Sequence, residues 1–214
     1  MKKQSTEIIV IGIVHFDPLG HNKLLAVMKD ISSANFFPDS IAVEWDENTA
    51  KTLIESRNLF RAYMLEKDPE LSEHYITAFS DALAYEADTH KEVFPDLAVL
   101  WLDEGRKIEE PMEYLKDRFA IHRYTLHFQD AKKFVSLKTL SDVSWKVALT
   151  DYGTTRDNTR DNIFYQKIVG ATDGGARRII IVVGANHANL DIRDSLASLL
   201  KCKGYKITAI ILDK

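Results

Sequence analysis

Apolar and polar residues follow a β-α-β-α order along the first third of the chain. Residues 7–14 are a continuous, mainly β-branched run, which is typical of a strand buried on both faces. Residues 20–32 carry leucine and methionine at helical spacing, and residues 40–44 predict a second, shorter strand. A further helix is expected after that strand, with Asn48 as its N-cap.

The last third of the chain repeats this order. A helix is predicted to begin around residues 155–158 and to end near Gly170. Strands are predicted at 178–183 and 205–212, with a helix over 189–201 between them. Strands that alternate with helices in this way favour a parallel sheet with right-handed crossovers.

The middle of the chain has mainly helical spacing. One more strand is predicted at 97–102, and the segments 50–95 and 106–150 are interpreted as a mainly helical insertion over the sheet. No long repeat, low-complexity tract or Gly/Ser linker divides the chain. We therefore expect a single three-layer α/β domain over residues 1–214, with a mainly parallel central sheet.

Composition and charge exclude several classes of protein. The 214 residues are 45% hydrophobic, which fits a globular core, and the net charge of −4 gives no footprint for nucleic acid. A single cysteine rules out an internal disulfide and a cysteine-based zinc site. No apolar stretch approaches the roughly 20 residues that span a bilayer, so we expect a cytoplasmic protein without membrane contacts.

The two ends of the chain share a motif, because a β-branched strand ends in Gly-x-x-His at each. Gly12 and His15 form the first copy, and Gly184 and His187 form the second. Glu44 ends the short second strand, a place where a carboxylate is rarely left unpaired. The carboxyl ends of parallel strands share one edge, where ligands bind, so these side chains are expected to converge. Each glycine lacks a Cβ and leaves room for a backbone or a ligand.

The convergent side chains point to metal chemistry. Two imidazoles and a carboxylate match the ligand set of hydrolytic zinc sites, and they also suit Mn²⁺, Fe²⁺ or Co²⁺. We expect His15, Glu44 and His187 to hold a divalent metal that activates water against a peptide or small-molecule substrate. If Glu44 is not a ligand, it is the natural general base. The leading expectation is a metal-dependent hydrolase.

A repeated tetrapeptide, TRDNTRDN, occupies residues 155–162. On a helix its spacing stacks Arg156 over Arg160 and places Asp161 on the next row. Helix capping explains the Asn, Asp and Thr residues but does not call for arginine in the first turn. We therefore expect Arg160 to stabilise developing charge, to hold a substrate carboxylate or to orient Glu44 through a bidentate pair, with Arg156 and Asp161 in support.

In their order along the chain, these motifs resemble those of the TraB/TIKI superfamily, which includes erythromycin-esterase-like proteins and ChaN-like haem-binding lipoproteins. The residues that match its two Gly-x-x-His motifs and its glutamate are Gly12, His15, Glu44, Gly184 and His187. Arg160 and Asp161 are similar to its Arg-Asp helix start, and Asp103 matches the end of its central strand. The resemblance implies a shared α/β core and, for the TIKI branch, a metalloprotease dependent on manganese or cobalt. Asp103 would then bind the metal or support a ligand.

Two other functions stay open at this point. The same histidines could bind haem or a metal without turnover, as the resemblance to ChaN-like proteins implies. The run from His15 to His21, HFDPLGH, also resembles the start of cytidylyltransferase-like nucleotidyltransferases. That interpretation lacks the first histidine of their His-x-Gly-His pair and leaves Glu44 and His187 unexplained. His21, at a helix start, is placed to reach the same crevice.

Overall fold

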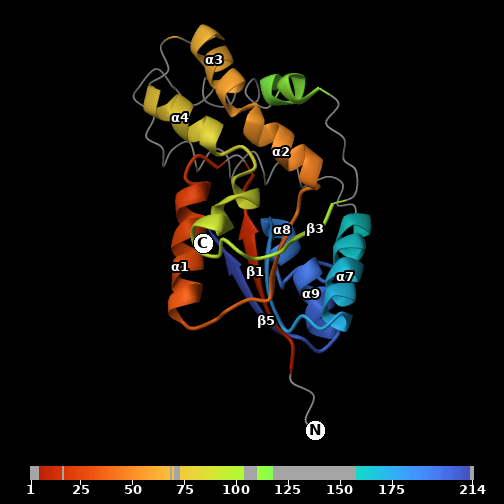
Figure 1. Cartoon of the computed structure of the whole chain (residues 1–214). Helices are drawn as coiled ribbons and strands as arrows, with labels where there is room; N and C mark the ends of the chain where they lie inside the picture. The colour runs from red at the N-terminus through yellow and green to blue at the C-terminus, as the bar shows by residue number, and fades with distance from the viewer. Residues whose placement is uncertain are drawn as a thin grey trace.

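The computed structural model of the chain shows how the predicted strands and helices are arranged (Figure 1). The structure is described for residues 5–15, 17–67, 69, 73–103, 110–117 and 158–212. The predicted helical segment 118–150 and Arg156 lie outside these residues. All statements on contacts below refer to the described part of the chain.

A five-stranded parallel sheet forms the centre of the molecule, in the order β3-β2-β4-β1-β5. The strands are β1 (Glu7–Ile13), β2 (Ser40–Val43), β3 (Val99–Trp101), β4 (Arg178–Gly184) and β5 (Lys206–Ile211). Four strands lie within the ranges that the hydrophobic pattern predicts, and β4 extends one residue beyond its range, to Gly184. β3 is only three residues long. The predicted three-layer α/β fold is confirmed.

Helices cover both faces of the sheet. As a result, every residue of the central strand β4 after Arg178 is buried. Ile179, Ile181 and Val183 pack on one side against α7 (Asn158–Asp173) and α9 (Leu196–Cys202). Ile180 and Val182 pack on the other side against α1 (Gly20–Ser33). Each fully buried Ile or Val contributes about 1.5–3 kcal/mol, so the alternation along β4 holds the three layers together.

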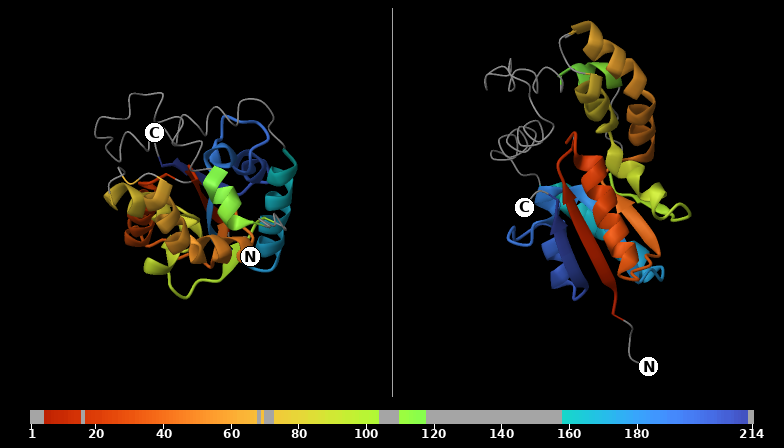
Figure 2. Two further views of the ribbon diagram at one scale, coloured as in Figure 1. Left: turned by 90° about the horizontal axis from the view of Figure 1, so that it is seen from above. Right: turned by 90° about the vertical axis from the view of Figure 1, so that its left-hand side faces the viewer.

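A second core lies beyond the carboxyl ends of the strands (Figures 1 and 2). It is built from α2 (Glu47–Glu55), α3 (Arg57–Lys67), α4 (Glu73–Asp81) and the helical segment 111–117. Its buried residues include Trp45, Leu53, Phe60, Phe79 and Leu115. Two short 3₁₀ turns, η1 (Tyr85–Ala87) and η2 (Thr89–Glu92), follow α4 and lead back toward β3. The described part of the predicted insertion is thus helical and stands over the edge of the sheet where the strands end.

Helix boundaries depart from the predictions where side-chain caps decide them. Asp46, and not Asn48, caps α2, because its carboxylate accepts the Thr49 N–H at 3.0 Å. The helix predicted over 189–201 is interrupted, and α9 begins only after Ser195, whose hydroxyl accepts the Ser198 N–H at 3.1 Å. None of the helices in the described ranges is both long enough and apolar enough to cross a membrane.

The first Gly-x-x-His motif brings a short helix close to β1. Gly12, near the carboxyl end of β1, pairs with Val183 of β4 and with Ile211 of β5. A Cβ at position 12 would lie 2.8 Å from Ala188 Cβ and 3.0 Å from Ala185 Cα, both in α8 (Ala185–Ala188). Only glycine therefore allows α8, which carries His187, to cross over the end of β1 at this distance.

Gly12→Ala is expected to lower the free energy of unfolding by about 1–3 kcal/mol, because the added methyl group overlaps backbone and side-chain atoms of α8. Urea unfolding measures the change. Gly170→Ala in α7 is the matched control, since a Cβ there meets no atom within 4 Å. The control should gain about 0.5–1 kcal/mol from helix propensity. A loss at Gly170 as large as that at Gly12 would contradict this account of the close approach.

Candidate active site at the carboxyl edge of the sheet

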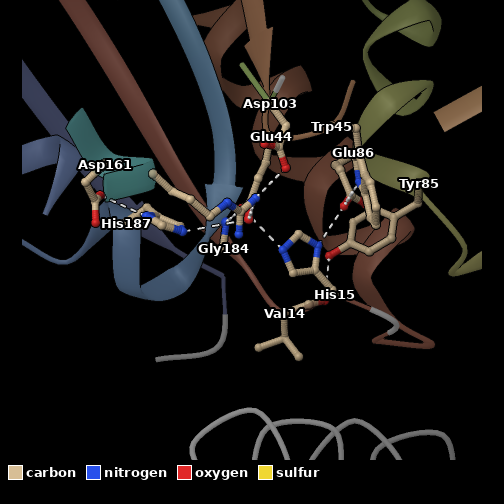
Figure 3. A network of polar contacts seen from close by, with 11 residues as sticks. Val14, His15, Glu44, Trp45, Tyr85, Glu86, Asp103, Asp161, Gly184 and His187 are labelled. Carbon is tan, nitrogen blue, oxygen red and sulfur yellow. Dashed lines mark hydrogen bonds and ion pairs between the residues drawn. The ribbon is translucent and has the colours of Figure 1, made fainter. Parts of the chain in front are cut away.

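Three neighbouring strands deliver the predicted site residues to one place (Figure 3). Glu44 follows β2, His187 follows β4, which ends at Gly184, and His15 follows β1. Because the strands are parallel, their carboxyl ends meet at the same edge of the sheet. The structure thus brings together the glutamate and both histidines that the two motifs predict.

Gly184 allows Glu44 and His15 to meet across the end of β4. A Cβ at position 184 would lie 3.3 Å from both Glu44 Oε2 and His15 Nε2. These two atoms are themselves 3.3 Å apart. The backbone N–H of Gly184 also donates a hydrogen bond of 2.5 Å to Glu44 Oε2. A side chain here would press against both groups of this ion pair.

Glu44 is the central carboxylate, with its side chain only 6% exposed. Its second oxygen, Oε1, lies 2.9 Å from Arg160 Nη2 and 3.7 Å from His187 Nε2. Burial alone would raise the pKa of Glu44, but the charges of His15, His187 and Arg160 outweigh it and hold the pKa well below its ordinary value. Glu44 is therefore an anion at neutral pH.

His15 lies between two carboxylates. Its Nε2 faces Glu44, and its Nδ1 is 2.7 Å from Glu86 Oε1. Burial opposes the charged imidazolium, but Glu44 and Glu86 together raise the pKa of His15 well above 6.5. The indole of Trp45 meets the imidazole edge-on at 5.7 Å. This environment favours a protonated His15.

His187 is oriented by a different carboxylate. Its Nδ1 lies 2.8 Å from Oδ1 of Asp161, a fully buried residue of α7. The same oxygen accepts the Leu196 N–H at the start of α9, at 2.7 Å. The ring of Phe164 packs beside the imidazole, with 5.4 Å between the two ring centroids. Asp161 therefore ties His187 to two helices and leaves Nε2 as the atom that faces Glu44.

Arg160 links the two other carboxylates of the predicted site. Its Nη2 lies 2.9 Å from both Glu44 Oε1 and Asp103 Oδ2. Asp103 follows β3 by two residues, so a fourth strand end contributes to the same place. The two carboxylates that were predicted as metal ligands thus both contact a fixed cation in the structure.

The remaining predicted residues lie elsewhere or support the site from outside. Gly12 makes room for α8 and touches none of the charged groups. His21 contacts Thr89 Oγ1 at 2.9 Å and Glu92 Oε1 at 3.0 Å, both in η2. Arg156 is outside the described residues.

Glu86 and Trp45 are the site residues that the sequence patterns do not reveal. Glu86 is fully buried and comes from η1, 71 residues away from His15. Neither a motif nor a strand end marks it. The one available signal was a carboxylate within the otherwise apolar run from Leu83 to Ala87. Its contact with Trp45, which follows Glu44, depends on tertiary packing.

Comparison with known proteins does not assign the chain to a family. No family model matches the sequence, and no curated protein matches it. Among solved structures, the type III effector HopBA1 is similar with a TM-score of 0.31 and 15% identity, covering 85% of this chain and 67% of that one. A score this low carries no argument about fold or activity.

The raised pKa of His15 predicts a pH-dependent contribution to stability. Below about pH 6.5 the unfolded histidine is also protonated, so the stabilisation by Glu44 and Glu86 is fully present. It is lost as the pH rises through the higher pKa of the folded state. Urea unfolding should show a difference between the wild type and His15→Gln that is largest near pH 6 and shrinks toward pH 9.

Lys51→Gln provides a control for this titration, since it removes an exposed pair with Glu47. Such exposed pairs contribute only a few tenths of a kcal/mol to the free energy of unfolding. Its effect should stay small and constant. An effect of His15→Gln that is also constant over this range would show that the imidazole is not held charged by its neighbours.

Proposed function

We propose that this site hydrolyses an ester or peptide bond by general acid–base catalysis, with His187 as base, His15 as acid and Arg160 as the stabilising cation. The observation that carries the proposal is that each imidazole has a buried carboxylate on Nδ1 and directs Nε2 toward the same glutamate. Such an arrangement fixes the direction and protonation of both rings before a substrate binds.

His187 is suited to the role of base. Asp161 Oδ1 accepts a backbone N–H from Leu196, so it also acts as an acceptor toward His187. In the neutral form that a general base requires, the imidazole proton then lies on Nδ1, and Nε2 keeps a lone pair. At 3.7 Å, Nε2 is too far from Glu44 Oε1 for a hydrogen bond. It can take a proton from a water molecule.

His15 is suited to the role of acid, because it lies between the carboxylates of Glu44 and Glu86. Both anions favour the imidazolium, which has a proton to give. In the proposed reaction His187 removes a proton from water, and the water oxygen bonds to the acyl carbon. The bond from that carbon to the leaving oxygen or nitrogen then breaks as His15 protonates the leaving group.

Arg160 supplies the positive charge that the developing oxyanion requires. Glu44 and Asp103 hold its guanidinium at the carboxyl edge, at 2.9 Å each. A charge fixed before the reaction stabilises the transition state without reorganisation. Glu44 thus has a positioning role toward both Arg160 and His15.

A second candidate is metal-dependent hydrolysis with Mn²⁺, Co²⁺ or Zn²⁺, as the resemblance to the TraB/TIKI superfamily implies. The observation in its favour is that carboxylates back both imidazoles, as they do at many metal sites. However, the described residues include no group of three or more His, Cys, Asp or Glu that could hold a metal ion. Arg160 pairs with Glu44 and Asp103 instead, so these residues do not fit a metal as they are placed.

A substrate screen with and without metal tests the proposal. Purified protein is treated with a chelator and assayed on chromogenic esters and a peptide library, and then assayed again with each of the three metals added. We expect turnover to persist in the chelator. Turnover that requires added metal would favour the second candidate. An absence of turnover under all conditions, together with a Soret band on haem addition that His15→Ala abolishes, would favour a haem-binding module.

His187→Ala is expected to lower kcat/KM by about 10²- to 10⁴-fold, because it removes the general base. Steady-state kinetics on the best substrate of the screen measures the effect. Arg160→Met should also lower kcat, since the oxyanion loses its cation. Arg61→Ala, which removes an exposed arginine paired with Glu73, is the control and should leave the kinetics unchanged. Similar losses in all three variants would argue against the assigned roles.

A further inference from the structure

His15 belongs to a closed network of hydrogen bonds and ion pairs. Its Nε2 meets Glu44, its Nδ1 meets Glu86, and Glu86 Oε1 also accepts a hydrogen bond from the indole N–H of Trp45. Trp45 directly follows Glu44 in the chain. The imidazole is therefore held on both nitrogens by groups that are connected to each other (Figure 3).

The position of Glu86 is costly in terms of stability. The residue has no exposed surface, and its Oε2 is buried without a hydrogen-bond partner among the described residues. A buried carboxylate that is only partly satisfied destabilises a fold unless a nearby charge compensates it. Among the described residues, His15 is the cationic group that contacts Glu86.

The neighbouring residue, Tyr85, holds the backbone beside His15. Its hydroxyl donates a hydrogen bond of 3.1 Å to the carbonyl of Val14. Its ring lies so close to Gly20 that a Cβ there would come within 2.3 Å of it. Tyr85 thus holds Val14 through its backbone carbonyl, and Glu86 holds the next residue, His15, through its side chain.

The turn that presents these two residues is strained and braced. Ala84 adopts a left-handed conformation with φ of 50°, which costs a non-glycine residue about 1 kcal/mol or more. Arg57 of α3 holds both ends of the turn. It donates to the Leu83 carbonyl at 2.6 Å and pairs with Asp88 at 2.9 Å. Strain of this kind persists where the surroundings enforce it, often at functional sites.

We infer that Glu86 is a positioning residue for His15, and that the turn of Leu83 to Asp88 aims His15 Nε2 into the site. The expected effect of Glu86 on catalysis rests on the proposed function, whereas its effect on the orientation of His15 does not. Glu86 touches His15 and Trp45 and acts on the reaction only through the imidazole.

Glu86→Gln and Glu86→Met separate positioning from simple packing. Glutamine keeps an oxygen that accepts from His15 and Trp45, whereas methionine fills a similar volume and accepts from neither. Glu92→Gln is the matched control. It neutralises an exposed carboxylate of the adjacent turn η2, which pairs with another histidine, His21.

Two readouts on folded protein test the inference. In ¹⁵N-edited NMR spectra, the ring nitrogens of His15 should show a changed protonation pattern in Glu86→Met, a smaller change in Glu86→Gln, which keeps the acceptor oxygen but loses the charge, and no change in Glu92→Gln. In the hydrolytic assay, Glu86→Met should lower kcat by about 10- to 100-fold with little change in KM. Glu86→Gln should recover much of this loss.

The NMR readout needs no substrate, so it decides the inference even if no hydrolytic activity is found. A Glu86→Met variant that is less stable, but whose His15 ring signals match the wild type, would overturn the positioning role. If Glu86→Met does not fold, Trp45→Phe, which removes the indole N–H donor to Glu86 together with part of a buried ring, is compared with Trp45→Tyr, which also lacks that N–H. A displaced His15 pattern in both variants would support the inference, and an unchanged pattern in both would overturn it.

Discussion

The charge of Glu44, buried at the end of a central strand, is the constraint on which the rest of the site depends. A carboxylate in this position needs compensation, and it receives it from the Gly184 N–H, His15 and Arg160. These groups come from β4, β1 and α7. Breaking a buried pair by removing one partner typically costs about 3–5 kcal/mol. One anion thus requires four elements of the fold to meet at a single edge.

The two Gly-x-x-His motifs work crosswise. Gly12, in the first motif, makes room for the helix that carries His187 of the second. Gly184, in the second motif, makes room for His15 of the first to reach Glu44. The tightest contacts that a Cβ would make at each glycine are thus with groups other than the histidine that follows it in sequence. The repeated pattern therefore reflects two parallel strands, each with a glycine that leaves room for a group belonging to the other motif.

Residues that follow strands were the most predictable part of the site. His15, Glu44 and His187 could be placed together because parallel strands end at one edge, and that rule needs only the hydrophobic pattern. The pairing of Asp161 with His187 could not be derived, because it depends on how α7 rotates against the sheet. Glu86 had only one weak signal, a carboxylate within a short apolar run, and that signal could not indicate its partner. The length of α9 was missed because Ser195 supplied a cap that a leucine-rich pattern obscures.

Trp45 is part of both the second hydrophobic core and the candidate site, so the stability of the site depends on that core. Its ring is part of the core formed by α2, α3 and α4, while its N–H contacts Glu86 beside His15. Small cores of this kind can open as a cooperative unit at a lower free energy than global unfolding. Opening of this one would withdraw Glu86 and the turn around it while the sheet stayed folded. The temperature at which the site fails would then be set by the helices above the strands, below the melting point of the sheet that carries its charged groups.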